Sequence, residues 1–104
     1  MSVDLARQEW EEGYRRIQSQ AKDRALYSHL LRQVDVVLAE LRRRLGGRFT
    51  LSDLAGEYQG AEQWAHEAIA RAETGEEPGW PRWVSTATDA AFHRYARGAQ
   101  DYRP

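Results

Sequence analysis

Apolar residues in the first part of the chain recur at steps of three and four, the spacing that places side chains on one face of an α-helix. From residue 3 to about 21 this apolar row consists of Val3, Ala6, Trp10, Tyr14, Ile17 and Ala21. The opposite face carries acid four residues before base, as in Glu11 and Arg15, an arrangement that favours an exposed helical surface. The pattern predicts an amphipathic helix whose polar face lies in solvent.

The segment from about 24 to 45 carries two adjoining apolar rows instead of one. Together they consist of Leu26, Tyr27, Leu30, Leu31, Val34, Val37, Leu38, Leu41 and Leu45. A helix with so broad an apolar surface is buried on two sides, so we expect it to be the central helix of the fold. Asp23 is placed to cap its beginning, and Gly46-Gly47 is placed to end it.

Shorter helices are expected in the second half of the chain. Thr50 precedes Asp53 by three residues, which is the spacing of a capping box, so a helix should cover 51–58. After a turn at Gln59-Gly60, the alanine-rich stretch up to Ala72 repeats the helical spacing. These two helices, joined by a short turn, have the outline of a helix-turn-helix.

The end of the chain combines a loop, a helix and a tail. Residues 74–81 contain two glycines and two prolines, so we expect a loop there. Ser85 or Thr86 should cap a last helix that ends at Gly98. Its inward row should consist of Ala87, Ala91, Phe92, Tyr95 and Ala96. The tail from Gln100 onward should be irregular.

No stretch shows the sustained period-two alternation of a half-buried strand. The sequence therefore predicts an all-α fold of four to five helices, in which a long N-terminal helical hairpin packs on a C-terminal set of shorter helices. With 104 residues the chain has a common size for one domain, so we expect 1–104 to be a single helical domain.

The composition excludes several classes of protein. The chain has no cysteine, which rules out a disulfide framework, a cysteine zinc finger, an iron–sulfur cluster and a thiol nucleophile. The first residues lack the basic and apolar regions of a secretory signal, and the longest apolar run, 36–39, is far too short to cross a bilayer. We therefore expect a cytoplasmic protein with no membrane partner.

The histidines do not predict a catalytic or metal site. His66 follows Glu62 by four residues and His93 follows Asp89 by four, so either pair could begin a metal site or an acid–base couple. Both uses need further convergent groups that the sequence does not announce, and there is no phosphate-binding loop or nucleophile elbow. We expect no cofactor, no metal and no enzymatic activity.

The helix-turn-helix outline over residues 50–72 supports an alternative function, a DNA-binding regulator. The basic cluster Arg42, Arg43, Arg44 and Arg48 would supply its nucleic-acid contacts. However, the second helix would expose Glu62 and Glu67, which repel phosphates, and three consecutive arginines point over most of a helical turn. Nucleic acid is therefore disfavoured as the partner.

The aromatic residues after the fourth helix lead to the preferred function. Trp80 and Trp83 flank Pro81-Arg82, and the tail holds Tyr102-Arg103. These side chains either fold back over the core or stay exposed as anchors for a partner, because tryptophan, tyrosine and arginine dominate binding hot spots. The leading hypothesis is a non-enzymatic protein–protein interaction module. The predicted partner-binding residues are Trp80, Arg82, Trp83, Tyr102 and Arg103.

A second copy of the chain is another expected partner. If the small C-terminal helices leave one apolar side of the helix at 24–45 uncovered, a homodimer would complete a four-helix bundle.

Three segments of the chain resemble a family of uncharacterised small helical proteins from GC-rich bacteria. They are Val34 to Leu45, Phe49 to Trp64 with Leu-Ser-Asp-Leu-Ala near its start, and Asp89 to Gly98. The resemblance implies a bacterial, cytoplasmic protein. It attaches no activity, cofactor or site residue to the chain.

Overall fold

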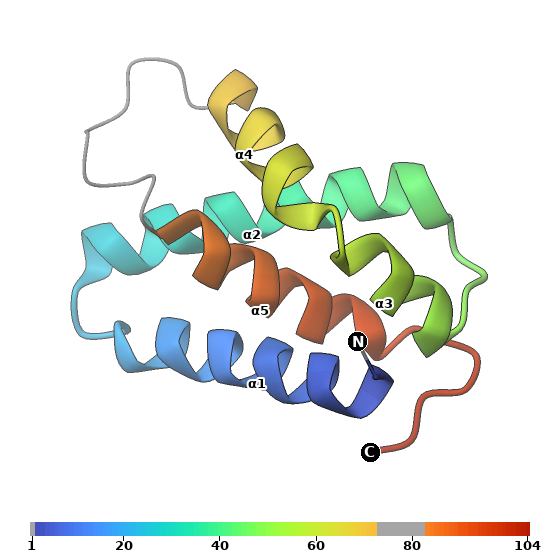
Figure 1. The fold of residues 1–104 in the computed structure, drawn as a ribbon. Coiled ribbons are helices and arrows are strands. Elements are labelled where there is room, and N and C mark those ends of the chain that lie inside the picture. The colour runs from blue at the N-terminus through green and yellow to red at the C-terminus, as the bar shows by residue number, and fades with distance from the viewer. Residues whose placement is uncertain (1, 73–82) are drawn as a thin grey trace.

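The computed structural model describes residues 2–72 and 83–104, and these residues form five α-helices (Figure 1). The helices are α1 (Val3–Ser19), α2 (Arg24–Leu45), α3 (Leu51–Tyr58), α4 (Ala61–Ala72) and α5 (Val84–Ala96). The prediction of an all-α fold with two long N-terminal helices packed on shorter C-terminal ones is confirmed. The turn at Gln59-Gly60 and the irregular tail are confirmed as well.

Three of the predicted helix ends are formed by the expected residues. The side chain of Asp23 accepts a hydrogen bond from the Leu26 backbone N–H at 3.1 Å. Thr50 and Asp53 form a reciprocal capping box, with hydrogen bonds of 3.1 and 3.0 Å. Gly46 ends α2 with a φ of +68°, a conformation that side chains other than glycine rarely adopt.

The predicted cap of the last helix is wrong. Helix α5 begins at Val84 after Trp83, and no side chain caps its first turn, while Ser85 and Thr86 lie inside the helix. The hydroxyl of Thr88 donates a hydrogen bond of 2.7 Å to the Val84 carbonyl, which satisfies this polar group within the helix itself. The start of this helix is therefore not marked by a capping side chain.

The central helix is α5 and not α2, so the prediction that the helix at 24–45 is central is wrong. Helices α1 and α2 run antiparallel, and α5 lies between them, in contact with all four other helices (Figure 1). Helix α5 is buried on almost every side, at Val84, Thr86, Ala87, Thr88, Ala90, Ala91, Phe92 and Ala96. Its small side chains let neighbouring helices approach closely, and its polar threonines hide this burial from a hydrophobicity pattern.

The contact between α1 and α5 depends on Gly13. A Cβ atom on Gly13 would lie 2.3 Å from Cβ of Asp89 and 3.0 Å from the carbonyl oxygen of Thr86. Gly13 is buried with Ala6, Trp10 and Ile17, whereas Tyr14, which was expected in this inward row, is 39% exposed. Tyr14 instead stacks on the ring of His93 at 4.8 Å.

An aromatic cluster joins four of the helices in the core. The ring of Phe92 in α5 lies 5.5 Å from Trp10 in α1, 5.1 Å from Tyr58 in α3 and 6.0 Å from Trp64 in α4. Phe92 is fully buried. Aromatic side chains therefore supply much of the core that holds α5 in place.

Candidate functional site

The predicted partner-binding residues do not form one surface in the part of the chain that the structure describes. Trp80 and Arg82 lie outside the described residues, so their roles stay predictions. Trp83 is partly buried and packs against the core at the beginning of α5. Tyr102 and Arg103 belong to the tail that follows the other end of α5. The described members of this set are thus separated by the length of that helix.

The tail is held against α1 and the turn before α3. The guanidinium of Arg7 lies over the Tyr102 ring at 5.4 Å and donates a hydrogen bond of 2.9 Å to the Arg103 carbonyl. The carboxylate of Asp101 accepts a hydrogen bond of 2.7 Å from the Leu51 backbone. Tyr102 is partly buried and Arg103 is exposed. Tyr102 therefore packs against the rest of the protein, which is one of the two alternatives that the sequence left open for this residue.

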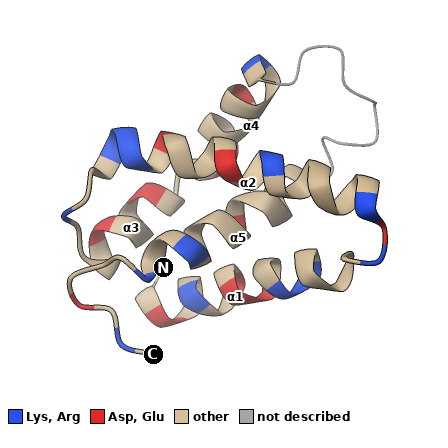
Figure 2. Cartoon of the chain, turned by 180° about the vertical axis from the view of Figure 1, so that it is seen from behind, with Lys and Arg blue, Asp and Glu red and all other residues tan. Residues whose placement is uncertain are grey.

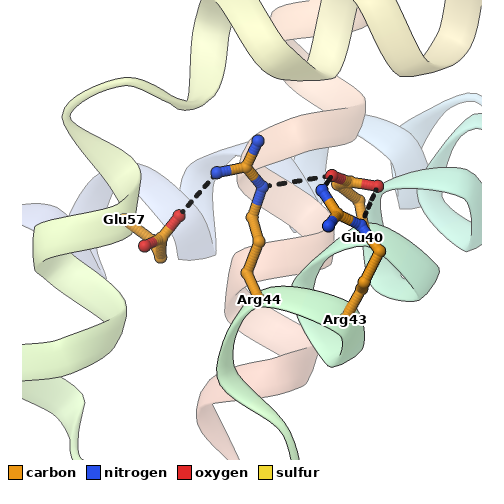
Figure 3. A network of polar contacts seen from close by, with 4 residues as sticks. All are labelled: Glu40, Arg43, Arg44 and Glu57. Carbon is orange, nitrogen blue, oxygen red and sulfur yellow. Dashed lines mark hydrogen bonds and ion pairs between the residues drawn. The ribbon is translucent and has the colours of Figure 1, made fainter.

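The arginine cluster at the end of α2 divides into side chains with different tasks (Figure 3). Arg43 and Arg44 both bind Glu40, and Arg44 also contacts Glu57 of α3 at 3.2 Å. The hydrogen bond from Arg43 is the main cause that lowers the pKa of Glu40. The Arg44 guanidinium lies 4.7 Å from the Trp64 ring centre. Arg44 therefore connects α2 with α3 and α4, whereas Arg43 pairs within α2 itself.

The helix-turn-helix outline is present in α3 and α4, but its exposed face is acidic. The exposed side chains of α4 include Glu62, Gln63, His66 and Glu67, and Arg71 in its last turn is the exposed basic residue of this helix. The ring Nδ1 of His66 lies 2.7 Å from the backbone carbonyl of Glu62, so the pairing that forms is with the backbone and not with the carboxylate. Phosphates would be repelled by this face.

A groove lies between the C-terminal half of α2 and the C-terminal end of α5. It has a volume of about 690 Å³. We refer to it as the α2–α5 groove; its lining residues are Asp35, Leu38, Ala39, Arg42, Gly46, Gly47, Phe49, Arg94, Tyr95 and Gly98. A cavity of this size falls within the range of ligand-binding clefts in proteins.

The aromatic part of the groove is built by residues that are far apart in sequence. Phe49, in the turn after α2, stacks on Tyr95 of α5 with a centroid distance of 4.7 Å. The Tyr95 hydroxyl donates a hydrogen bond to the Gly46 carbonyl at the end of α2. Burial raises the pKa of Tyr95, so the phenol stays neutral and keeps its proton for this bond. The groove thus has a rigid aromatic wall before any ligand arrives.

The charged part of the groove is predominantly basic. Arg42 and Arg94 line it together with a single acidic residue, Asp35. Figure 2 shows basic segments at the C-terminal end of α2 and on α5, the two helices that border the groove. Of the four arginines in the predicted nucleic-acid cluster, Arg42 is the one among the described lining residues. The prediction that the cluster cannot aim at one ligand agrees with this division.

A second polar cluster joins α1, α3 and α5. The hydroxyl oxygen of Tyr58 lies 2.8 Å from a carboxylate oxygen of Glu9 and 2.5 Å from one of Asp89. Burial raises the pKa of Asp89 to about 6, and burial together with the bond to Asp89 raises the pKa of Tyr58. Sequence reasoning missed this cluster because Tyr58 is 49 residues from Glu9 and 31 from Asp89.

The described residues were also compared with the requirements of a metal site and of a membrane-spanning helix. Among residues 2–72 and 83–104, no group of three or more His, Asp or Glu side chains could hold a metal ion. Within the same ranges, none of the helices combines the length and the apolar character that spanning a membrane requires. His93, expected to pair with Asp89, stacks on Tyr14 instead, and Asp89 contacts Tyr58.

Comparison of the chain with protein-family models, with curated proteins and with solved structures finds no match. The resemblance to small helical proteins of GC-rich bacteria therefore stays a prediction.

Proposed function

We propose that this chain is a non-enzymatic helical module that binds another protein, and that the α2–α5 groove takes an acidic segment of that partner. The observation that carries the proposal is the combination of a stacked aromatic wall, formed by Phe49 and Tyr95, with two arginines in one groove. Aromatic and arginine side chains contribute most of the binding energy at protein interfaces.

The apolar part of the groove suits a hydrophobic side chain of the partner. Leu38 and Ala39 of α2 line the groove beside the aromatic pair. Because the Tyr95 hydroxyl is already bound to the Gly46 carbonyl, the phenol ring is held in one orientation. A preorganised wall of this kind lowers the entropy lost on binding.

The arginines give the groove its preference for acidic groups. Arg42 and Arg94 outnumber Asp35 among the lining residues, which leaves an excess of one positive charge. Arginine binds carboxylates through two parallel N–H···O bonds, so a partner segment with an aspartate or glutamate next to an apolar residue would satisfy both parts of the groove. The protein's own net charge of −1 gives no general attraction to nucleic acid.

The surfaces predicted from the sequence remain proposed secondary contacts. Trp83 at one end of α5, and Tyr102 with Arg103 beyond the other, would each extend an interface past the groove. A DNA-binding regulator remains the alternative function, with Arg42, Arg43, Arg44 and Arg48 as its proposed contacts. Arg43 and Arg44 already pair with Glu40, so DNA contacts by these two arginines would have to replace these ion pairs. A protein partner in the α2–α5 groove would leave them in place.

The proposal is tested with a displayed library of random twelve-residue peptides that is selected on the purified protein. We expect enriched peptides to carry aspartate or glutamate beside an aromatic or aliphatic residue. Their affinity, measured by fluorescence anisotropy, should fall at least about tenfold in the Arg42→Glu, Arg94→Glu variant, since each lost charge-assisted bond is worth over 1 kcal/mol.

The control is Arg24→Glu, which reverses an exposed charge at the other end of the same helix and should leave peptide binding unchanged. Equal affinity of the groove variant and the wild type, or enrichment without acidic residues, would show that the groove is not the binding surface. Binding to duplex DNA that weakens steeply with salt would instead support the regulator.

A further inference from the structure

The hydroxyl of Tyr58 contacts two carboxyl groups, those of Glu9 and Asp89, and these two hydrogen bonds need one proton more than the phenol supplies. Tyr58 ends α3, Glu9 lies on α1 and Asp89 lies on α5, so the three side chains connect three helices. One carboxylate oxygen of Glu9 and one of Asp89 lie within hydrogen-bond distance of the same phenol oxygen. A phenol has a single proton to donate, so it can serve one ionised carboxylate but not two.

The second contact is therefore favourable only when one of the carboxyl groups is protonated. A protonated carboxyl donates its own O–H to the phenol oxygen, and the phenol then donates to the other carboxylate. Asp89 is the better site for this proton because it is partly buried, whereas Glu9 is exposed. Loss of the proton would leave two negative charges facing one donor.

The charged groups around Asp89 are mostly acidic, so they do not compensate for the missing proton. Glu9, Glu12 and Arg16 face Asp89 from α1, and Tyr58 faces it from α3. Glu62 of α4 lines a pocket of about 240 Å³ together with Tyr58 and Asp89. Arg16 is the one cation among these facing groups, against three other carboxylates.

We propose that Tyr58, Asp89 and Glu9 form a proton-dependent latch, which holds the C-terminal end of α3 against α1 and α5 and releases it when the shared proton is lost. Helix α3 is only 8 residues long, and its buried residues, Leu51, Leu54 and Ala55, precede Tyr58. Release of Tyr58 therefore leaves the last turn of α3 attached through the ion pair of Glu57 with Arg44 of α2. It also removes the edge-to-face contact of Tyr58 with Trp10, whose ring centres are 5.6 Å apart.

The pH at which the latch opens follows from the burial of Asp89. Burial raises the pKa of Asp89 to about 6 in the closed state, against an ordinary value of 3.8, and it outweighs the hydrogen bond from Tyr58, which lowers this pKa. A raised pKa means that the closed state is stabilised at low pH and that this stabilisation is lost as pH rises through 6. For these two values, the ratio of open to closed latch rises about tenfold between pH 5 and pH 7.5.

The experiment is hydrogen exchange of the α3 amides at pH 5 and 7.5, corrected for the intrinsic rate, together with ¹³C titration of the Asp89 carboxyl. We expect protection of residues 55–58 to fall about tenfold at the higher pH. In Asp89→Asn the amide still donates to the phenol oxygen and cannot ionise, so the pH dependence should disappear. Asp4→Asn, which changes an exposed acid on α1, should behave as the wild type.

Two results would overturn the proposal. One is an Asp89 carboxyl that titrates near 4 in the wild-type protein, a measurement that does not depend on any variant folding. The other is a protection ratio between the two pH values that is the same in the Asp89→Asn variant and in the wild type. If Asp89→Asn does not fold, Glu9→Gln replaces it, and there the Asp89 midpoint should move downward because a like charge has been removed.

Discussion

At the residue scale, Gly13 decides how closely α1 can approach α5. The space for its missing side chain is occupied by Cβ of Asp89 and by the Thr86 carbonyl. The backbone of Gly13 is ordinary helix, so it is space and not conformational freedom that requires glycine here. Neighbouring Ala90 belongs to the same close contact.

Gly13→Ala should destabilise the protein by about 1–3 kcal/mol, because backbone atoms of α5 cannot move away without separating the two helices. Urea denaturation followed by circular dichroism measures this change. The matched control is Gly56→Ala in α3, where an added Cβ meets no atom within 4 Å. The free energy of unfolding of that variant should rise by up to about 1 kcal/mol, since alanine has a higher helix propensity than glycine. Equal effects at both positions would contradict the close contact.

His93 predicts a pH effect of opposite sign to that of Asp89. Burial and then Arg97 lower the pKa of His93 below its ordinary 6.5. The folded state resists protonation of this ring, so stability is lost as pH falls through 6.5 toward the lowered value. His93→Gln should therefore be more stable relative to the wild type at pH 5 than at pH 7.5. Urea midpoints of both proteins at the two pH values measure this, and a pH-independent difference would rule it out.

At the scale of the elements, the beginning of α3 is held by local and distant side chains together, and its end by distant ones. The capping box of Thr50 and Asp53 could be read from the sequence because its partners are three residues apart. Asp101, which binds the Leu51 N–H, and Asp89, which binds Tyr58, come from other parts of the chain. The helix is thus predictable where its partners are local.

Thr50→Ala should lower the free energy of unfolding by about 1 kcal/mol, because the side chain that accepts the Asp53 N–H is removed. Ser52→Ala changes an exposed residue in the same turn and should alter stability by less than about 0.5 kcal/mol. Thermal melts of the two variants compare them directly. A Thr50→Ala melt that coincides with the wild type would mean that Asp101 alone maintains the start of the helix.

At the scale of the whole molecule, the core is assembled around one helix by aromatic side chains from the others. Phe92 meets rings from α1, α3 and α4. Removal of this ring leaves a cavity at the point where four helices converge, and the surrounding aromatic rings cannot close it without moving their helices.

Phe92→Ala should therefore lower the free energy of unfolding by about 3–5 kcal/mol, a large share of the stability of a domain of this size. Tyr14→Ala, which removes a partly exposed ring from α1, should cost far less. Guanidinium titrations of both variants give the comparison. Similar guanidinium midpoints for the two variants would contradict the central position of Phe92 in the core.

The homodimer expected from the sequence stays a prediction at this scale. Light scattering distinguishes a monomer of 12.0 kDa from a particle of twice that mass. A dimer that persists in the Arg42→Glu, Arg94→Glu variant would bury a surface other than the α2–α5 groove.

The sequence indicated the fold class and most helix ends, but it identified few of the site residues. Asp23, Gly46 and the Thr50–Asp53 pair mark helix boundaries with partners nearby in the chain. Arg42 was singled out as one of four clustered arginines, without a reason to prefer it. Phe49, Arg94 and Tyr95, which complete the groove, come from the turn before α3 and from α5, and no local spacing connects them.

The sequence by itself determined that the chain is helical and where most helices begin and end, because periodicity and capping act over a few residues. Tertiary structure alone decided that α5, with its alanines and buried threonines, is the central helix, because close approach depends on small side chains and not on hydrophobicity. It also decided which charges meet. Glu9, Tyr58 and Asp89 are brought together only when three helices pack, and so are the two arginines of the α2–α5 groove.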